Sequence, residues 1–94
     1  MKKRFRDENG QLTVTLAELH KLTEKEGREY YQPGNIYLNN SDNRKYVYLQ
    51  PTESDGELAH FMSVDGYNLF IPIANFGTFL PDVASDGMEL VKVA

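Results

Sequence analysis

Few residues in this chain have side chains suited to catalysis or metal binding. The 94 residues include two histidines and no cysteine, and the histidines, His20 and His60, lie forty positions apart. Neither histidine belongs to a spacing such as H-E-x-x-H, which brings two metal ligands onto one face of a helix. The absence of cysteine excludes thiolate zinc sites, disulfides and a cysteine nucleophile. The sequence therefore predicts no metal site and no cofactor.

Acid-base catalysis needs two carboxyl groups in one cleft, with one of them shielded from water. The acids Glu53, Asp55 and Glu57 instead alternate along a polar loop, PTESDGE, where we expect all three to face water. The sequence contains no G-x-S-x-G nucleophile motif and no glycine-rich phosphate loop. We therefore expect a protein that is not an enzyme.

Tyrosine is in surplus for so small a core, with six in the chain, and three of the six fall in the strand-like stretches IYL and KYVYLQ. Tyrosine is enriched at protein interfaces because it offers a large contact area with few rotatable bonds. We predict a partner-binding surface formed by Tyr37, Tyr46, Tyr48, Glu53, Asp55 and Glu57.

The distribution of charge favours a protein partner over nucleic acid. Residues 1–45 carry nine Lys and Arg against seven acids, and residues 46–94 carry one Lys against seven acids, so the net charge of -4 comes from the second half. An acidic surface repels phosphates and attracts basic proteins. We expect a small acidic protein-binding module, an inhibitor or accessory factor of a basic, nucleic-acid-handling protein, and a homodimer is compatible with the same surface.

The alternative function is single-stranded nucleic-acid binding by a small barrel that stacks bases on the same tyrosines. Such platforms are normally surrounded by Lys and Arg, and here only Arg44 and Lys45 lie near the tyrosines in the sequence. The first helix and the basic stretch KKRFR also resemble part of a helix-turn-helix, but no second amphipathic helix follows.

The opening residues MKKRFRDENG include four basic residues in the first six, but no apolar run follows them. We therefore expect neither a secretory signal nor a membrane span, and a cytoplasmic location. No repeat, low-complexity tract or linker divides the sequence, so we expect a single domain over 1–94.

One helix is predicted at the N-terminal side. Thr15 and Glu18 fit a capping box, in which the two side chains satisfy the free amides of a helix start. The spacing predicts a helix over 16–26 that buries a stripe formed by Leu16, Leu19 and Leu22, and Gly27 is suited to end it.

Strands account for most of the remaining chain. Asn9 and Gly10 predict a turn between short strands at 3–6 and 12–16. A second hairpin is predicted from strand-like residues at 36–38 and 45–50. The stretch HFMSVDGYNLFIPI predicts a third, with a two-residue turn at Asp65 and Gly66 that sets Phe61 opposite Phe70. Its predicted core face consists of His60, Met62, Val64, Tyr67, Leu69 and Ile71.

The segment 74–87 is rich in Gly, Pro and other turn formers. We expect a packed loop over Phe61 and Phe70, with one helical turn at 81–85, and then a closing strand in MELVKV. Because several strands carry large apolar side chains on both faces, the sheet must curl and be covered. The predicted fold is α+β: a small curved antiparallel sheet or SH3-like partly open barrel of five or six strands, with one N-terminal amphipathic helix.

Overall fold

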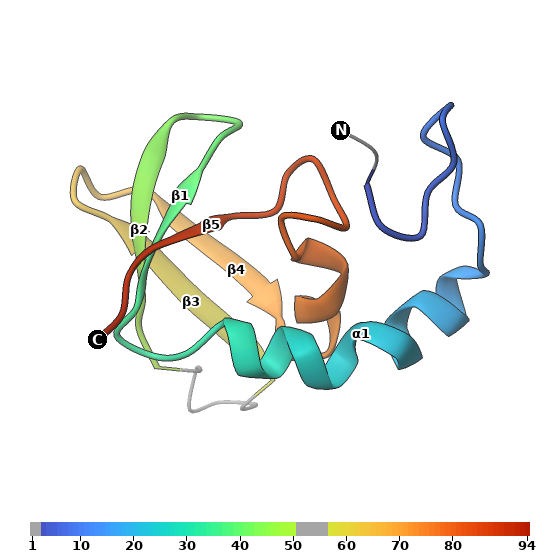
Figure 1. The fold of residues 1–94 in the computed structure, drawn as a ribbon. Helices are drawn as coiled ribbons and strands as arrows, with labels where there is room; N and C mark the ends of the chain where they lie inside the picture. Colours follow the sequence, from blue (N-terminus) through green and yellow to red (C-terminus); the bar gives the residue numbers. More distant parts are fainter. Residues whose placement is uncertain (1–2, 51–56) are drawn as a thin grey trace.

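The computed structural model describes residues 3–50 and 57–94 and has an α+β fold in which one helix and one 3-10 helix pack on a five-stranded antiparallel sheet (Figure 1). The strands follow the order β4-β3-β2-β1-β5, and the sheet is open, as in the first of the two predicted architectures. The elements in chain order are α1 (Leu16–Tyr30), β1 (Ile36–Asn39), β2 (Arg44–Tyr48), β3 (Leu58–Ser63), β4 (Asn68–Pro72), η1 (Ile73–Phe79) and β5 (Glu89–Lys92).

Helix α1 begins at the predicted capping box. The Thr15 hydroxyl accepts a hydrogen bond from the Glu18 amide at 3.1 Å, and the Glu18 carboxylate accepts one from the Thr15 amide at 3.3 Å. The predicted end at Gly27 is wrong, because the helix continues to Tyr30. Gly27 is instead buried against η1, where an added Cβ would lie 2.2 Å from the Gly77 nitrogen. The glycine allows a close approach of two backbones and does not terminate the helix.

The buried stripe of α1 is made mainly of small residues and not of leucines. Leu19, Thr23 and Gly27 are buried, whereas Leu16 and Leu22 are 58% and 57% exposed. The predicted leucine stripe therefore holds only at Leu19. These small side chains, one helical turn apart, allow η1 to pack close to the helix axis. The buried Thr23 hydroxyl donates a hydrogen bond to the Leu19 carbonyl at 2.6 Å, so it is not left without a partner.

The turn between β3 and β4 has three residues, 64–66, and not the predicted two. The Ser63 amide donates to the Tyr67 carbonyl at 2.9 Å, and the Gly66 amide donates to the Ser63 carbonyl at 3.1 Å. Gly66 has a φ of 92°, so the turn ends in the left-handed conformation typical of a three-residue hairpin loop.

The longer turn shifts the pairing of β3 with β4 by one residue, so that Phe61 lies opposite Leu69 and His60 lies opposite Phe70. A shift of one residue exchanges the two faces of a strand. The predicted core face is therefore right for Leu69 and Ile71 and wrong for the residues of β3 and the turn, since the buried side chains of β3 are Ala59, Phe61 and Ser63.

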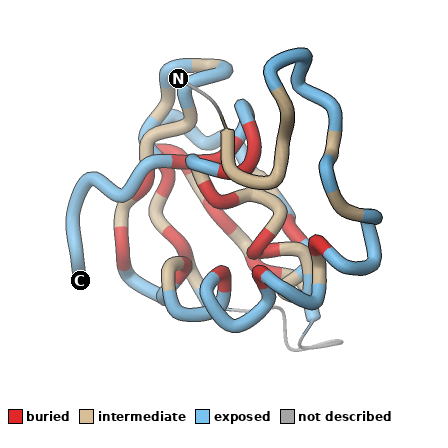
Figure 2. Tube along the Cα trace, turned by 45° about the vertical axis from the view of Figure 1, so that its right-hand side comes forward, coloured by how far each residue is buried: buried red, intermediate tan, exposed pale blue. Residues whose placement is uncertain are grey.

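A single aromatic core lies between the sheet and the elements that cover it. Phe76 of η1 packs on Tyr48 and Tyr31, with ring centroids 5.8 and 5.0 Å apart. Phe61 also lies within this cluster, but Phe70 is on the other side of the sheet and half exposed, so the predicted cover of both rings is wrong for Phe70. Figure 2 shows the buried residues gathered where the strands, α1 and the segment after β4 face one another.

The N-terminal segment forms a second, smaller cluster. The predicted N-terminal hairpin is reduced to one bridge between Arg6 and Leu12. Leu12, Phe5 and Val14 pack against a buried group consisting of Leu19, Leu80 and Val83. The N-terminal residues thus extend the hydrophobic interior beyond the sheet, over the start of α1.

Candidate protein-interaction surface

The predicted tyrosine surface is buried. Tyr37, Tyr46 and Tyr48 are 0%, 4% and 3% exposed, because they lie on the face of the sheet that η1 and the end of α1 cover. The prediction that they form a partner-binding surface is therefore wrong. The same burial leaves the three rings unable to stack on nucleic-acid bases. Of the predicted acids, Glu57 is exposed just before β3, and Glu53 and Asp55 lie outside the described residues.

The buried tyrosines connect elements through their hydroxyl groups. The Tyr37 hydroxyl donates to the Tyr30 carbonyl at 2.6 Å and accepts from the Gln32 amide at 2.9 Å, so it satisfies backbone groups at the end of α1. The Tyr31 hydroxyl donates to the Phe79 carbonyl at 2.5 Å and accepts from the Met88 amide at 3.2 Å. Burial raises the pKa of Tyr31 well above its usual range, so the phenol stays protonated and can donate.

The side of the sheet away from α1 and η1 carries a second set of apolar side chains. We call it the open face. Because successive strand residues point to opposite faces, the neighbours of the buried residues all point to this side. Its apolar residues are Ile36, Leu38, Val47, Leu49, Leu58, Met62 and Phe70.

The strand pairing aligns these side chains in rows across the sheet. Ile36 pairs with Val47, and Val47 pairs with Met62, so three aliphatic side chains form one continuous row over β1, β2 and β3. In the next row, His60 stacks on Phe70 with ring centroids 4.6 Å apart and an interplanar angle of 13°. Among the described residues, no open-face side chain belongs to either buried hydrophobic cluster.

Charged side chains of both signs lie at the β1 and β5 end of the open face. Leu38 pairs with Lys45 on one side and Glu89 on the other, and Lys92 pairs with Ile36. An apolar centre with a polar, charged rim is the usual anatomy of a protein interface. The arrangement can therefore bury apolar area while its charges remain in water.

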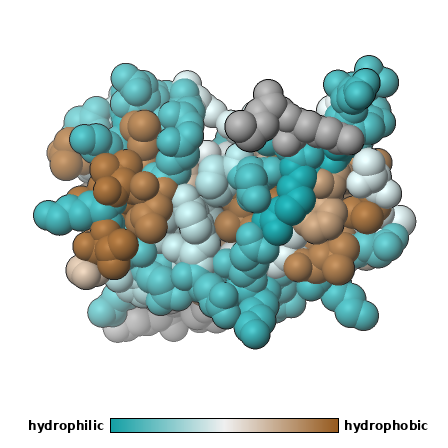
Figure 3. Space-filling view, in the orientation of Figure 1, coloured by the Kyte–Doolittle hydropathy of each residue, from teal (hydrophilic) through white to brown (hydrophobic). Residues whose placement is uncertain are grey.

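Exposed apolar residues also occur at two other places on the surface. Figure 3 shows hydrophobic side chains over the β5 end of the sheet and over the start of α1. Leu16 and Leu22 of α1 lie about 120° apart around the helix, because six residues advance it by roughly one and two-thirds turns. The helix leucines therefore do not form one patch, whereas the open face does.

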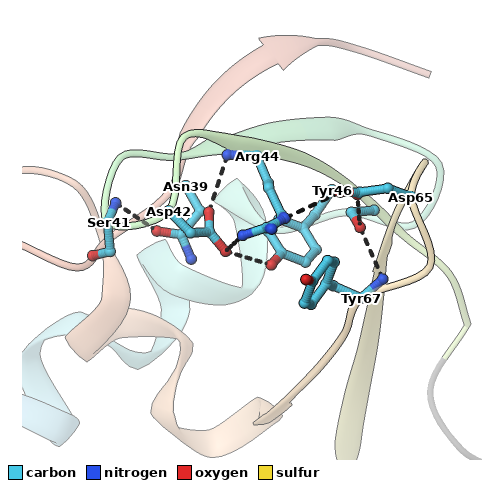
Figure 4. Close-up of polar contacts among 8 residues, drawn as sticks. Asn39, Ser41, Asp42, Arg44, Tyr46, Asp65 and Tyr67 are labelled. Carbon is cyan, nitrogen blue, oxygen red and sulfur yellow. Dashed lines mark hydrogen bonds and ion pairs between the residues drawn. The ribbon is translucent and has the colours of Figure 1, made fainter.

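A polar cluster joins the tips of the two central hairpins (Figure 4). Arg44 lies 3.2 Å from an Asp65 carboxylate oxygen and 3.7 Å from one of Asp42, and its guanidinium covers the Tyr67 ring at 3.8 Å. Asp42 also accepts a hydrogen bond from the Tyr46 hydroxyl at 2.6 Å, which holds the pKa of that carboxyl below its usual value. Every charge in the cluster has a partner within it, so its role is to hold the hairpin tips together.

Ion pairs also offset part of the charge asymmetry seen along the sequence. Arg4 lies 2.6 Å from a Glu26 carboxylate oxygen and 3.2 Å from one of Asp82, and Arg44 pairs with Asp65. Two acids of the negative second half thus contact arginines of the positive first half. The fold therefore brings part of the negative second half into contact with the positive first half.

A pocket of about 190 Å³ opens beside β4. Its buried lining is apolar and includes Tyr31, Ile71 and Met88, and its exposed rim includes Asp86. Typical small-molecule sites have volumes of about 300 to 1,000 Å³. This pocket is below that range, although a ring or a branched aliphatic group would fit in it.

The structure brings together none of the predicted site residues as an exposed group, and the open face was missed as a site. The signal was present in the sequence, because Val47 and Leu49 alternate with Tyr46 and Tyr48, and both alternating sets are apolar. Within residues 3–50 and 57–94, no three His, Asp or Glu side chains are grouped closely enough to hold a metal ion. No helix in these ranges has the length and apolarity needed to cross a membrane.

Comparison with known proteins adds no assignment to this geometry. No family model matches the chain, and neither a curated protein nor a solved structure is significantly similar to it.

Proposed function

We propose that this protein is a protein-binding module that docks another folded protein on the open face of its sheet. The observation that supports the proposal is the set of seven apolar open-face side chains, which lies across four adjacent strands and outside both buried clusters. Phe70 is exposed and the other six are partly buried, so none of the seven is fully enclosed. Contiguous apolar surface that remains partly accessible to water marks interaction sites in small proteins.

The charges on this face favour a partner of mixed charge over a strongly basic one. Lys45, Lys92 and Glu89 surround the β1 and β5 end, so a uniformly basic surface would meet two like charges there. Like charges in an interface oppose binding, and complementary ones mainly increase the rate of association. The expected partner therefore presents an apolar surface edged by both acids and bases.

The chemistry of the open face also supports a protein over a nucleic acid. Base-stacking platforms need several exposed aromatic rings in a basic groove, and the central row of the open face is aliphatic, formed by Ile36, Val47 and Met62. The His60 and Phe70 rings in the next row stack on each other. Aliphatic rows pack well against the apolar side of a helix or a second sheet.

The test compares two Val→Lys substitutions. A photo-crosslinking amino acid at Val47, in the middle of the open face, captures the partner from a native lysate, and the same amino acid at the fully exposed Val64 is the control. The captured protein is then purified and titrated with the wild type, Val47→Lys and Val64→Lys, after circular dichroism has shown that each variant is folded.

We expect Val47→Lys to weaken binding by about 2 kcal/mol or more, because it places a charge at the centre of the apolar surface. Val64→Lys makes the same chemical change at the tip of the β3–β4 turn and is expected to bind like the wild type. Equal binding by both variants, or crosslinks only between two copies of this chain, would contradict the proposal.

A further inference from the structure

The outer edge of β4 offers unpaired backbone groups. β4 is the last strand in the sheet order and pairs only with β3. In an antiparallel pair, alternate residues direct their N–H and C=O groups toward the partner strand. The bonds from Ser63 to Tyr67 and from Ile73 to Glu57 fix which residues of this segment face β3.

Counting in steps of two from those bonds, residues 67, 69, 71 and 73 face β3. Asn68, Phe70 and Pro72 therefore direct their backbone groups outward, and Pro72 has no N–H to offer. The outward edge thus presents two amides and three carbonyls. Proline at this position also limits how far another chain can pair along the edge.

The pocket beside β4 meets this backbone edge. Its lining includes four consecutive residues of β4, 69 to 72. Side chains of consecutive strand residues point to opposite faces, so a cavity lined by all four must adjoin the edge of the strand and not one face alone. On its far side the pocket is lined by Asp86 and Met88, which precede β5 at the other end of the sheet. The opening therefore lies between the two ends of the strand order.

We propose that the β4 edge binds an extended peptide of another protein as a sixth strand, with one aliphatic or aromatic side chain of the peptide in the pocket. Only an extended chain matches the spacing of the outward amide and carbonyl groups, and strand addition of this kind takes its affinity from the backbone and its specificity from side-chain pockets. A cavity of about this size, lined by Leu, Ile and Phe, can bind a benzene ring.

The rim of the pocket indicates which residue accompanies the anchoring side chain. Asp86 is exposed, and within the described residues it has no hydrogen bond or ion pair. The nearby cations Lys3 and Arg6 donate to the Pro81 and Val83 carbonyls, and neither forms an ion pair with Asp86. A Lys or Arg next to the anchoring side chain would therefore complete the site.

A second copy of this chain is a poorer occupant of the edge. In a symmetric pair of β4 strands centred on Phe70, the side chains next to each pocket would be Leu69 and Ile71 of the other copy. Ile71 is buried in the core of its own copy and Leu69 packs against that core, so neither is available to fill the partner's pocket. A separate peptide can instead place one of its own side chains in the pocket.

The experiment selects binders from a displayed library of random ten-residue peptides on the full chain and then titrates the enriched peptides. We expect enriched sequences with one large apolar residue and an adjacent Lys or Arg. Backbone amide NMR shifts should be confined to the β4 edge and the pocket lining, that is, to 31, 39, 68–71, 75, 79 and 86–88. Absence of an enriched peptide, shifts on Val47 and Met62 instead, or a chain that dimerises through β4 would overturn the proposal.

Two substitutions of Phe70 distinguish the contribution of its backbone amide to peptide binding from that of its phenyl ring. Phe70→Pro removes the outward amide, and Phe70→Val removes the same phenyl ring but keeps the amide. We expect Phe70→Pro to weaken peptide binding about tenfold, the effect of one hydrogen bond at the upper end of its usual range, and Phe70→Val to change it by less than about threefold. Equal affinities for the two variants would exclude strand addition.

Asp86→Lys tests the rim without changing the strand, which keeps the proposal testable if Phe70→Pro does not fold. We expect this variant to lose affinity for the Lys- or Arg-containing peptides, and unchanged affinity would contradict the assigned role of Asp86. The edge and the open face are tested independently, because Val47→Lys should leave peptide binding unchanged. Failure of one proposal is therefore distinguishable from failure of the other.

Discussion

The two faces of the sheet are both apolar, but they differ in the kind of side chain they carry. The core face has three tyrosines and Phe61, and the open face is mainly aliphatic. Hydrophobicity alone does not tell the inside from the outside of such a sheet. What distinguishes the core face is how its tyrosines are held. The Tyr37 hydroxyl donates to the backbone at the end of α1 and the Tyr46 hydroxyl to an acid at a hairpin tip, and the Tyr48 ring packs between aromatic rings.

The largest difference in the free energy of unfolding is expected between alanine variants of two phenylalanines on adjacent strands. Phe61 is fully buried among aromatic rings, and Phe70 is 51% exposed beside His60. Phe61→Ala should lower the free energy of unfolding by about 3 to 5 kcal/mol, and Phe70→Ala by about 1 kcal/mol or less. Urea denaturation of both variants measures the difference. Similar losses would mean that the open face is itself covered in the folded chain.

Gly27→Ala tests the contact that holds η1 over the core face. In an ordinary helix this substitution stabilises by about 0.5 to 1 kcal/mol. Here the new Cβ would meet backbone atoms at 2.2 to 2.6 Å, so we expect destabilisation of about 1 to 3 kcal/mol. Thermal denaturation measures the change, with Lys25→Ala at an exposed position of the same helix as the control. A stabilised Gly27→Ala variant would show that η1 can move away at little cost.

Tyr31→Phe tests whether polar satisfaction distinguishes the core face. The substitution keeps the ring but leaves the Phe79 carbonyl and the Met88 amide without their shared partner. We expect a loss of about 1 to 2 kcal/mol in unfolding free energy. Tyr67→Phe, at a half-exposed ring, is the matched control and should change stability by less than about 0.5 kcal/mol. If both variants lost the same unfolding free energy, the hydrogen bonds of the Tyr31 hydroxyl would not stabilise the core face.

The smallest change in stability is expected when the pH is lowered, and it arises at the polar cluster of the hairpin tips. The pKa of Asp42 is lowered by its hydrogen bond from Tyr46, and the pKa of Asp65 by its bond from Ser63. Because both carboxyls ionise more readily in the folded chain, their contribution is complete above about pH 4 and is lost as the pH falls further. Urea midpoints from about pH 6 to about pH 3 should fall less steeply for the Asp42→Asn, Asp65→Asn double variant than for the wild type. Parallel curves would rule out this contribution.

Local signals in the sequence located the start of α1 and the strands of the sheet, but not the end of the helix, the 3-10 helix η1 or the strand faces. The capping box located the start of α1, and alternation located β2 and β5. The faces of β3 were wrong because Asp65 and Gly66 suit both a two-residue and a three-residue turn, and one residue of difference reverses a strand. The segments 7–11 and 63–67 form the same three-residue turn, although Asn9-Gly10 and Asp65-Gly66 both also suit a two-residue one, so the local sequence does not decide between the two lengths.

The remaining errors have a common origin in contacts between distant segments. Gly27 was predicted to end the helix because its partner, Gly77, lies fifty residues further on and nothing local indicates their contact. Tyr37, Tyr46 and Tyr48 were predicted at the surface because the segment that covers them lies far along the chain, as Phe76 of η1 does in its ring contact with Tyr48. A side chain that a distant segment covers cannot be told from an exposed one in a single sequence.

The strand order also has a consequence for how the chain folds. Each of β1 to β3 pairs with the strand that follows it in the sequence, so the four strands β1 to β4 can assemble from local hairpins. β5 instead pairs with β1 across more than fifty residues, as in the pair Ile36 and Lys92. Closing so long a loop is entropically costly before any contact offsets it. We therefore expect the four-stranded meander to form early in refolding and β5 to join last, and in native-state hydrogen exchange the amides of β5 should open at lower free energy than those of β2 and β3.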